Sequence, residues 1–174
     1  MARYKTTVST ATDPDTAFAA LARFSTTEDW DPGVRAARML TPEPVGLGSE
    51  FELMVVFAGR TLPTVYRVVE YDAAARHVVL FADEKHFTSR DAIDVSVATA
   101  GKDVATPGAD KAAAADRAAA GGATTLVTYD AELHLKGAGA IADPALKLAF
   151  GRVGRRAEAG LRAYVDGLST ADSG

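Results

Sequence analysis

The side chains of this sequence that could take part in chemistry are two tyrosines, an arginine and a histidine, in or beside predicted strands. Buried, Tyr66 and Tyr129 would each seek a hydrogen-bond partner and supply polar contacts in an apolar pocket, although either could equally be a structural core residue. Arg90 could hold a carboxylate or enolate oxygen if it points inward, and is otherwise a surface arginine. His86 could act as an acid or base near neutral pH, but its charged neighbours indicate a solvated hairpin tip.

Other kinds of active site are not indicated by the sequence. The three histidines, His77, His86 and His134, show no ligand spacing, so we expect no metal site. We also expect no cofactor, because no phosphate loop, dinucleotide fingerprint or GxSxG serine motif is present. The absence of cysteine excludes disulfides, thiol catalysis and thiolate–zinc sites. A formal net charge of −4 without a basic stripe argues against nucleic-acid binding.

The elements that would position these side chains are a series of strands and one long helix. Apolar residues at steps of three or four predict a helix from Asp143 to Leu168. Alternating or apolar runs before it predict strands at residues 4–9, 36–41, 50–57, 62–71, 77–82, 87–97 and 124–135. Pro63 requires a place near the start of its strand or on a sheet edge. Short turns between consecutive strands indicate an antiparallel meander.

Two short helices are predicted between the first two strands. Asp13 can cap the free amides of the first, and Pro14 suits its first helical position. The second covers residues 24–30 and ends at the proline–glycine turn of residues 31–33.

Residues 98–122 differ from the rest of the chain because alanine, glycine, aspartate and lysine dominate them. Few of these side chains could anchor to a core, so we expect an exposed insertion between the last two strands. Too little chain follows it to form a second core. The sequence therefore predicts a single domain over residues 1–174.

Several segments together resemble a known family: residues 12–14 with Phe18, residues 30–33, 66–72 and 124–137, and Asp143-Pro144 with the helix beyond. They are similar to the START-like superfamily, also called SRPBCC, and most closely to its polyketide cyclase/dehydrase-like branch. The resemblance implies an α+β helix-grip fold, in which a curved antiparallel sheet of six or seven strands wraps a long C-terminal helix around a hydrophobic cavity. The superfamily includes lipid carriers, cyclases and hormone receptors, so the fold alone does not assign the chemistry.

The residues expected to bind a ligand would line that cavity. They are Trp30, Phe51, Leu53, Val55, Tyr66, Val68, Phe81, Arg90, Tyr129, Phe150 and Val153. Apolar alternation places Phe51, Leu53 and Val55 on the inward face of their strand, although plain core residues would give the same pattern. In relatives the region of Trp30 borders the cavity mouth, but this ring could instead pack the short helix onto the sheet. Which residues of the strand at 62–71 face inward stays open.

These expectations favour the binding of a small hydrophobic or amphipathic ligand, such as a lipid, a polyketide or an aromatic metabolite. The alternative is a polyketide cyclase or dehydratase that uses the same cavity to orient a reactive chain beside one acid or base, without a metal or nucleotide cofactor. An ionisable group that faces the cavity would favour the enzyme. A third possibility is an interaction module whose cavity is filled with side chains.

The expected setting is a cytoplasmic monomer or homodimer with no nucleic-acid partner and no integral membrane association. The N-terminus has no apolar signal core. The longest strongly apolar run, residues 53–58, is far shorter than the roughly 20 residues of a membrane span.

Overall fold

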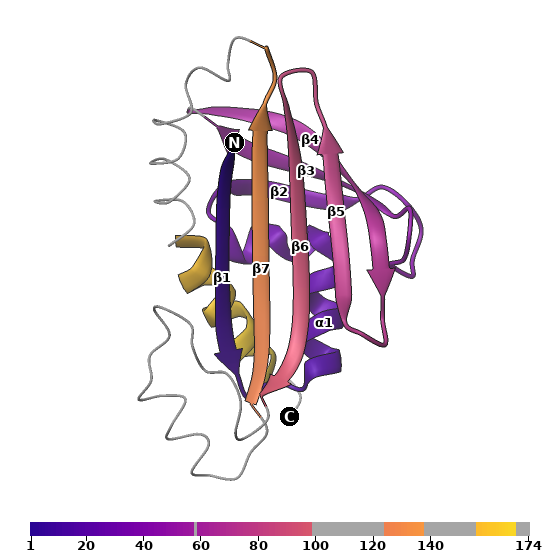
Figure 1. Cartoon of the computed structure of the whole chain (residues 1–174), viewed down its shortest axis with the longest axis vertical. Helices are drawn as coiled ribbons and strands as arrows, with labels where there is room; N and C mark the ends of the chain where they lie inside the picture. The colour runs from indigo at the N-terminus through magenta and orange to yellow at the C-terminus, as the bar shows by residue number, and fades with distance from the viewer. Residues whose placement is uncertain (58, 99–123, 138–155, 170–174) are drawn as a thin grey trace.

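The computed structural model describes residues 1–57, 59–98, 124–137 and 156–169, which form one antiparallel sheet with helices on one side. The sheet has seven strands in the order β1-β7-β6-β5-β4-β3-β2. They are β1 (Ala2–Thr10), β2 (Val34–Met39), β3 (Glu50–Phe57), β4 (Arg60–Asp72), β5 (His77–Asp83), β6 (Phe87–Ala98) and β7 (Thr124–Leu135). In Figure 1, β2, β3 and β4 run nearly crosswise to β1, β7 and β6, so the sheet is strongly curved. The predicted α+β helix-grip fold is confirmed.

Three short helical segments connect β1 to β2, and a separate helix ends the described chain. They are α1 (Pro14–Ala22), η1 (Phe24–Thr26) and α2 (Thr27–Trp30), followed far along the sequence by the C-terminal helix, residues 156–169. The Asp13 carboxylate accepts hydrogen bonds from the N–H groups of Asp15 and Thr16 at 3.0 and 2.9 Å, which confirms the predicted cap of α1. Among the described residues, each helix is too short or too polar to span a bilayer.

The strand boundaries follow the sequence pattern closely. The predicted ranges of β3 and β7 match the structure, whereas β2 begins at Val34 and ends at Met39, two residues earlier than predicted at each end. Pro63 lies within β4, opposite Met54 of β3, and pairing of β4 with β5 begins only at Arg67. The missing N–H of Pro63 therefore faces no second strand, as expected for proline in a sheet.

The two faces of the sheet have different compositions. We call the face covered by α1 and the C-terminal helix the inner face, and the opposite face the outer face (Figure 1). On β4 the inner positions are Tyr66 and Val68, which are 7% and 1% exposed, while Val65 and Val69 on the outer face are each 41% exposed. Even-numbered residues therefore face inward as far as Val68, and a bulge between Val68 and Glu70 then places Tyr71 against the core. The hydrophobic core consists of the inner-face residues and the apolar side chains of α1, η1 and α2.

The C-terminal helix packs into this core through every fourth residue. Ala157, Leu161 and Val165 are buried, and Tyr164 is partly buried against the same core. The Thr12 hydroxyl donates a hydrogen bond to the Val165 carbonyl, which ties the helix to the loop after β1. Gly160 allows the closest approach, because a Cβ atom there would lie 2.0 Å from the Trp30 carbonyl oxygen.

Candidate functional site

The inner face of the sheet carries one buried carboxyl group, that of Asp91 on β6. Asp91 is 3% exposed and lies between Leu80 of β5 and Ala131 of β7 in the sheet register. Its two carboxylate oxygens accept hydrogen bonds from the Tyr129 hydroxyl at 2.5 Å and from the Ser89 hydroxyl at 2.9 Å. An acidic side chain is seldom buried in this way unless other groups satisfy it, so the arrangement marks a candidate site.

The environment of Asp91 raises the pKa of its carboxyl group towards neutral pH. Burial raises the pKa of the Asp91 carboxyl to about 6, against the opposing effect of the hydroxyl groups of Tyr129, Ser89 and Tyr66, and the nearby charge of Asp31 raises it further. Burial, followed by the charge of Asp91, raises the pKa of the Tyr66 and Tyr129 phenols well above their ordinary value. Both phenols therefore stay protonated at neutral pH and can donate hydrogen bonds, while the carboxyl group can exchange a proton.

A second carboxyl group and an indole complete the polar end of the inner face. Asp31, directly after α2, accepts a hydrogen bond from the Gly33 N–H at 2.7 Å, and burial raises its pKa. The Trp30 ring meets the Tyr129 ring edge-to-face, with centroids 5.3 Å apart and planes at 81°. Trp30 is only 2% exposed, and its Nε1–H has no hydrogen-bond partner among the described residues. A buried donor left unpaired costs about 1–3 kcal/mol, which a bound acceptor would recover.

Apolar side chains surround this polar end. Phe51, Leu53 and Val68 are no more than 2% exposed, and Val55 is partly buried against the same core. The Phe24 ring of η1 lies 5.3 Å from the Tyr66 ring and 6.4 Å from the Phe51 ring, both at steep angles. The predicted inward parity of β3 is therefore confirmed for these residues, and six of the predicted ligand-binding residues belong to the same core cluster as Tyr129 or pack against it.

Two predicted ligand-binding residues face the other way. Arg90 lies on the outer face, where its guanidinium group is 3.8 Å from the Glu70 carboxylate. Phe81 pairs with Arg90 across the strands and is 37% exposed. The prediction that they line the inner face is wrong, because side chains alternate along a strand and Asp91 and Leu80 already take the neighbouring inward positions.

The remaining predictions have simpler outcomes. His86 is exposed in the turn between β5 and β6, as its charged neighbours indicated. Phe150, Val153 and nearly all of the 98–122 insertion lie outside the described residues. Asp91 was missed as a site residue although the sequence held a signal for it. It shares its parity on β6 with Ile93 and Val95, so the apolar alternation already placed a carboxyl group on the buried face.

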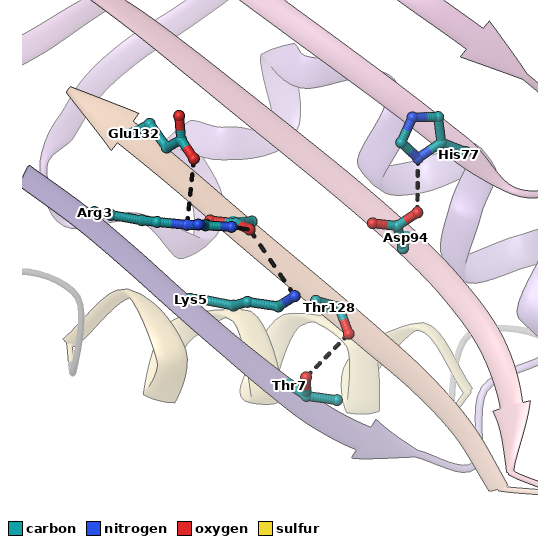
Figure 2. A network of polar contacts seen from close by, with 8 residues as sticks. Arg3, Lys5, Thr7, His77, Asp94, Thr128 and Glu132 are labelled. Carbon is teal, nitrogen blue, oxygen red and sulfur yellow. Dashed lines mark hydrogen bonds and ion pairs between the residues drawn. The ribbon is translucent and has the colours of Figure 1, made fainter. Parts of the chain in front are cut away.

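The outer face holds paired charges instead. Ion pairs join β1 to β7, where Arg3 contacts Glu132 and Lys5 contacts Asp130 (Figure 2). His77 of β5 lies beside Asp94 of β6 in the same view. A shallow hollow of about 250 Å³ lies on β2 and β3, lined by Ala36, Ala37, Arg38, Glu52 and Met54. Glu52 and Met54 alternate with buried Phe51 and Leu53, so this hollow opens away from Asp91. Among the described residues, no group of three acidic or histidine side chains could hold a metal ion.

Comparison with known proteins finds one matching family and several structures with a similar fold. Residues 1–166 match the model of a family described as polyketide cyclase/dehydrase and lipid transport. A START superfamily protein from Mycobacterium smegmatis is 18% identical, with a TM-score of 0.65 and coverage of 95% of this chain and 98% of that one. The Zhui aromatase/cyclase from Streptomyces sp. R1128 is 16% identical, with a TM-score of 0.61 and coverage of 94% and 93%. No curated protein matches the sequence.

Proposed function

Since the chain belongs to the polyketide cyclase/dehydrase and lipid transport family, we propose that it binds a small, mostly apolar molecule between the inner face of its sheet and its C-terminal helix. The observation that carries this proposal is the composition of the inner face: apolar and aromatic walls with one buried cluster of hydrogen-bonding groups around Asp91. Ligand sites commonly combine an apolar lining with a few polar groups that fix orientation. Trp30, Phe51, Leu53, Tyr66, Val68 and Tyr129 would contact the ligand.

The test uses Trp30, the one tryptophan of the sequence, as a local reporter. N-phenyl-1-naphthylamine, a neutral apolar probe, should bind saturably at one site per chain and quench Trp30 fluorescence by energy transfer. The outer-face variant Phe81→Ala should bind the probe with unchanged affinity. The absence of saturable binding by calorimetry, or binding without energy transfer from Trp30, would contradict the proposal.

A second candidate function is a ring-closing or water-eliminating enzyme, and the Asp91–Tyr129 pair favours it. A carboxyl group with a pKa of about 6 can both accept and return a proton near neutral pH, and a phenol that remains protonated can polarise a carbonyl oxygen. In the dehydration of a β-hydroxy ketone, the Tyr129 hydroxyl would turn from Asp91 to donate to the carbonyl oxygen, and Asp91 would remove the α-proton. The protonated Asp91 would then return that proton to the β-hydroxyl group, which leaves as water while the carbon–carbon double bond forms.

This chemistry is tested with 4-hydroxy-4-phenylbutan-2-one, whose dehydration gives a conjugated enone that absorbs in the ultraviolet. An active protein should form the enone faster than buffer alone, and Asp91→Asn should lower that rate at least about a hundredfold, the lower end of general acid–base effects. The Asp130→Asn variant on the outer face is the matched control and should retain it. A wild-type rate equal to that of buffer would refute the enzymatic function and leave ligand binding as the proposed function.

A further inference from the structure

The polar end of the inner face has an unusual balance of charge. Its ionisable groups are two carboxyls, Asp31 and Asp91, and two phenols, Tyr66 and Tyr129, which lie close enough to influence one another's proton affinity. Every lysine and arginine among the described residues is exposed or only partly buried. Arg90, the cation whose strand position is nearest to Asp91, points to the outer face and lies beside Glu70. Within this part of the chain, no buried cation offsets the carboxyl charge.

This balance determines which ligand head groups would be accepted. A carboxylate or phosphate placed beside Asp91 would meet a like charge in a site with little water, where repulsion is strong. A neutral hydroxyl group meets two complementary partners. It can donate a hydrogen bond to the Asp91 carboxylate, and its oxygen can accept one from the Trp30 Nε1–H, for which no described residue is a partner.

Both partners, Asp91 and Trp30, contact Tyr129. The Tyr129 hydroxyl donates to Asp91 at 2.5 Å, and the Trp30 ring lies against the Tyr129 ring with a centroid distance of 5.3 Å. The C-terminal helix fixes the backbone of Trp30, because Gly160 packs directly against the Trp30 carbonyl group. An indole fixed in this way would present its N–H without a large ordering cost.

We propose that this site selects neutral hydroxylated ligands, namely phenols and enols, over carboxylates and phosphates with the same carbon skeleton. Asp91 receives the hydroxyl proton and Trp30 Nε1 binds the hydroxyl oxygen. This inference rests on the proposed binding function and adds the chemical class of the ligand. It separates the protein from carriers of fatty acids or phospholipids, which require a cation or a solvated mouth for their anionic head groups.

The experiment compares three naphthalene ligands by calorimetry at pH 7.5. 2-Naphthol is neutral and offers both a donor and an acceptor, 2-methoxynaphthalene offers an acceptor alone, and 2-naphthoate is an anion of similar size. The wild-type protein should bind 2-naphthol at least about tenfold more tightly than 2-naphthoate and several-fold more tightly than 2-methoxynaphthalene. Because this comparison uses the unmodified chain, it does not depend on whether any variant folds.

Variants assign the selectivity to the named groups. In Asp91→Asn the preference for 2-naphthol over 2-naphthoate should fall at least fivefold, while Asp130→Asn on the outer face should keep the wild-type ratio. Trp30→Phe should weaken 2-naphthol binding several-fold. Equal binding of all three ligands, or tighter binding of 2-naphthoate, would overturn the selectivity and leave the proposed binding function intact. Failure of all three to bind at millimolar concentration would overturn both.

Discussion

Two aspartates on neighbouring strands show how differently the two faces of this sheet treat the same side chain. Asp91 of β6 lies opposite Ala131, and Asp130 of β7 lies opposite Ala92, so the two residues are one position apart in the register and on opposite faces. Both are largely buried, at 3% and 7% exposed. Asp91 is held by the hydroxyl groups of Tyr129 and Ser89, whereas Asp130 is gripped by the Arg3 guanidinium group at 2.8 and 2.5 Å.

The consequence is an opposite effect on proton affinity. Burial raises the pKa of Asp91 to about 6, while the hydrogen bond and charge of Arg3 lower the pKa of Asp130. On the outer face, cations meet the carboxylates and the charges serve to join strands (Figure 2). On the inner face, the part of the chain that the structure describes holds a carboxyl group without a cation, which is costly for stability and useful for ligand recognition or proton transfer.

The largest expected effect comes from one residue type on the two faces. Phe51→Ala should lower the free energy of unfolding by about 3–5 kcal/mol, because Phe51 is fully buried and the shortened side chain leaves a cavity. Phe81→Ala should cost about 1 kcal/mol or less, because Phe81 is 37% exposed on the outer face. Urea unfolding measures both. Equal losses would show that the outer face is covered in solution and would remove the basis of the comparison.

The next effect concerns the pH dependence of stability. Asp91 binds its proton more tightly in the folded than in the unfolded protein, so its contribution to the free energy of unfolding falls as pH rises from about 4 to about 6. From a shift between 3.8 and about 6, the change is about 3 kcal/mol. Asp91→Asn should therefore gain about 3 kcal/mol relative to wild type between pH 4 and pH 7.

Asp130→Asn is the matched control and should behave in the opposite way. The pKa of Asp130 is lowered in the folded protein, so its contribution is present above its unfolded pKa and is lost as pH falls through its folded value. The variant should lose stability relative to wild type as pH rises from about 3 to 5. Urea unfolding across this pH range measures both variants, and slopes of the same sign would refute the assignment of opposite environments.

A smaller effect is expected where the C-terminal helix closes the inner side. Gly160→Ala would place a Cβ atom 2.0 Å from the Trp30 carbonyl oxygen, and the backbone must shift to avoid it. Overpacking of this kind costs about 1–3 kcal/mol. Gly167→Ala in the same helix meets nothing within 4 Å and should instead stabilise the helix by up to about 1 kcal/mol. Thermal unfolding compares the two, and a neutral Gly160→Ala would show that the helix lies further from α2.

Local patterns carried most of the fold and only part of the site. Alternation placed β3, β7 and their inward residues correctly because one buried face imposes a period of two on the sequence. The contact between Gly160 and Trp30 could not be predicted, since Trp30 lies far away in the sequence and meets the helix only through tertiary packing. The orientation of Arg90 could not be predicted from its residue type, because an arginine can either bind an anion on the inner face or pair with a carboxylate on the outer face.

Asp91 shows the limit of reading residue types without their register. Its place on β6 fixed the direction of its side chain, but its pairing with Tyr129 depends on the register between β6 and β7, in which Ile93 lies opposite Tyr129. A shift of that register by one residue would have turned the hydroxyl group to the outer face. The chemical character of the site therefore arises from strand pairing between residues 38 positions apart in the sequence.

The smallest effect lies on the outer face, at His77. Partial burial lowers the pKa of the imidazole, but the hydrogen bonds and charges of Asp94, at 2.6 Å, and of Glu70, at 3.4 Å, outweigh it and raise the pKa. The stabilisation is therefore complete below the unfolded pKa of about 6.5 and is lost as pH rises through the folded value. His77→Gln should cost less than about 1 kcal/mol at pH 5.5 and less still at pH 8, because the site is partly solvated. The control is His86→Gln at the exposed turn, which should not change the free energy of unfolding differently at the two pH values.

Salt separates the His77 effect from that of Asp91. Added salt should reduce the effect of His77→Gln on stability, whereas the pH dependence due to Asp91 should persist because buried groups are screened little. A His77 effect that resists salt would mean that the outer face also holds charges away from water.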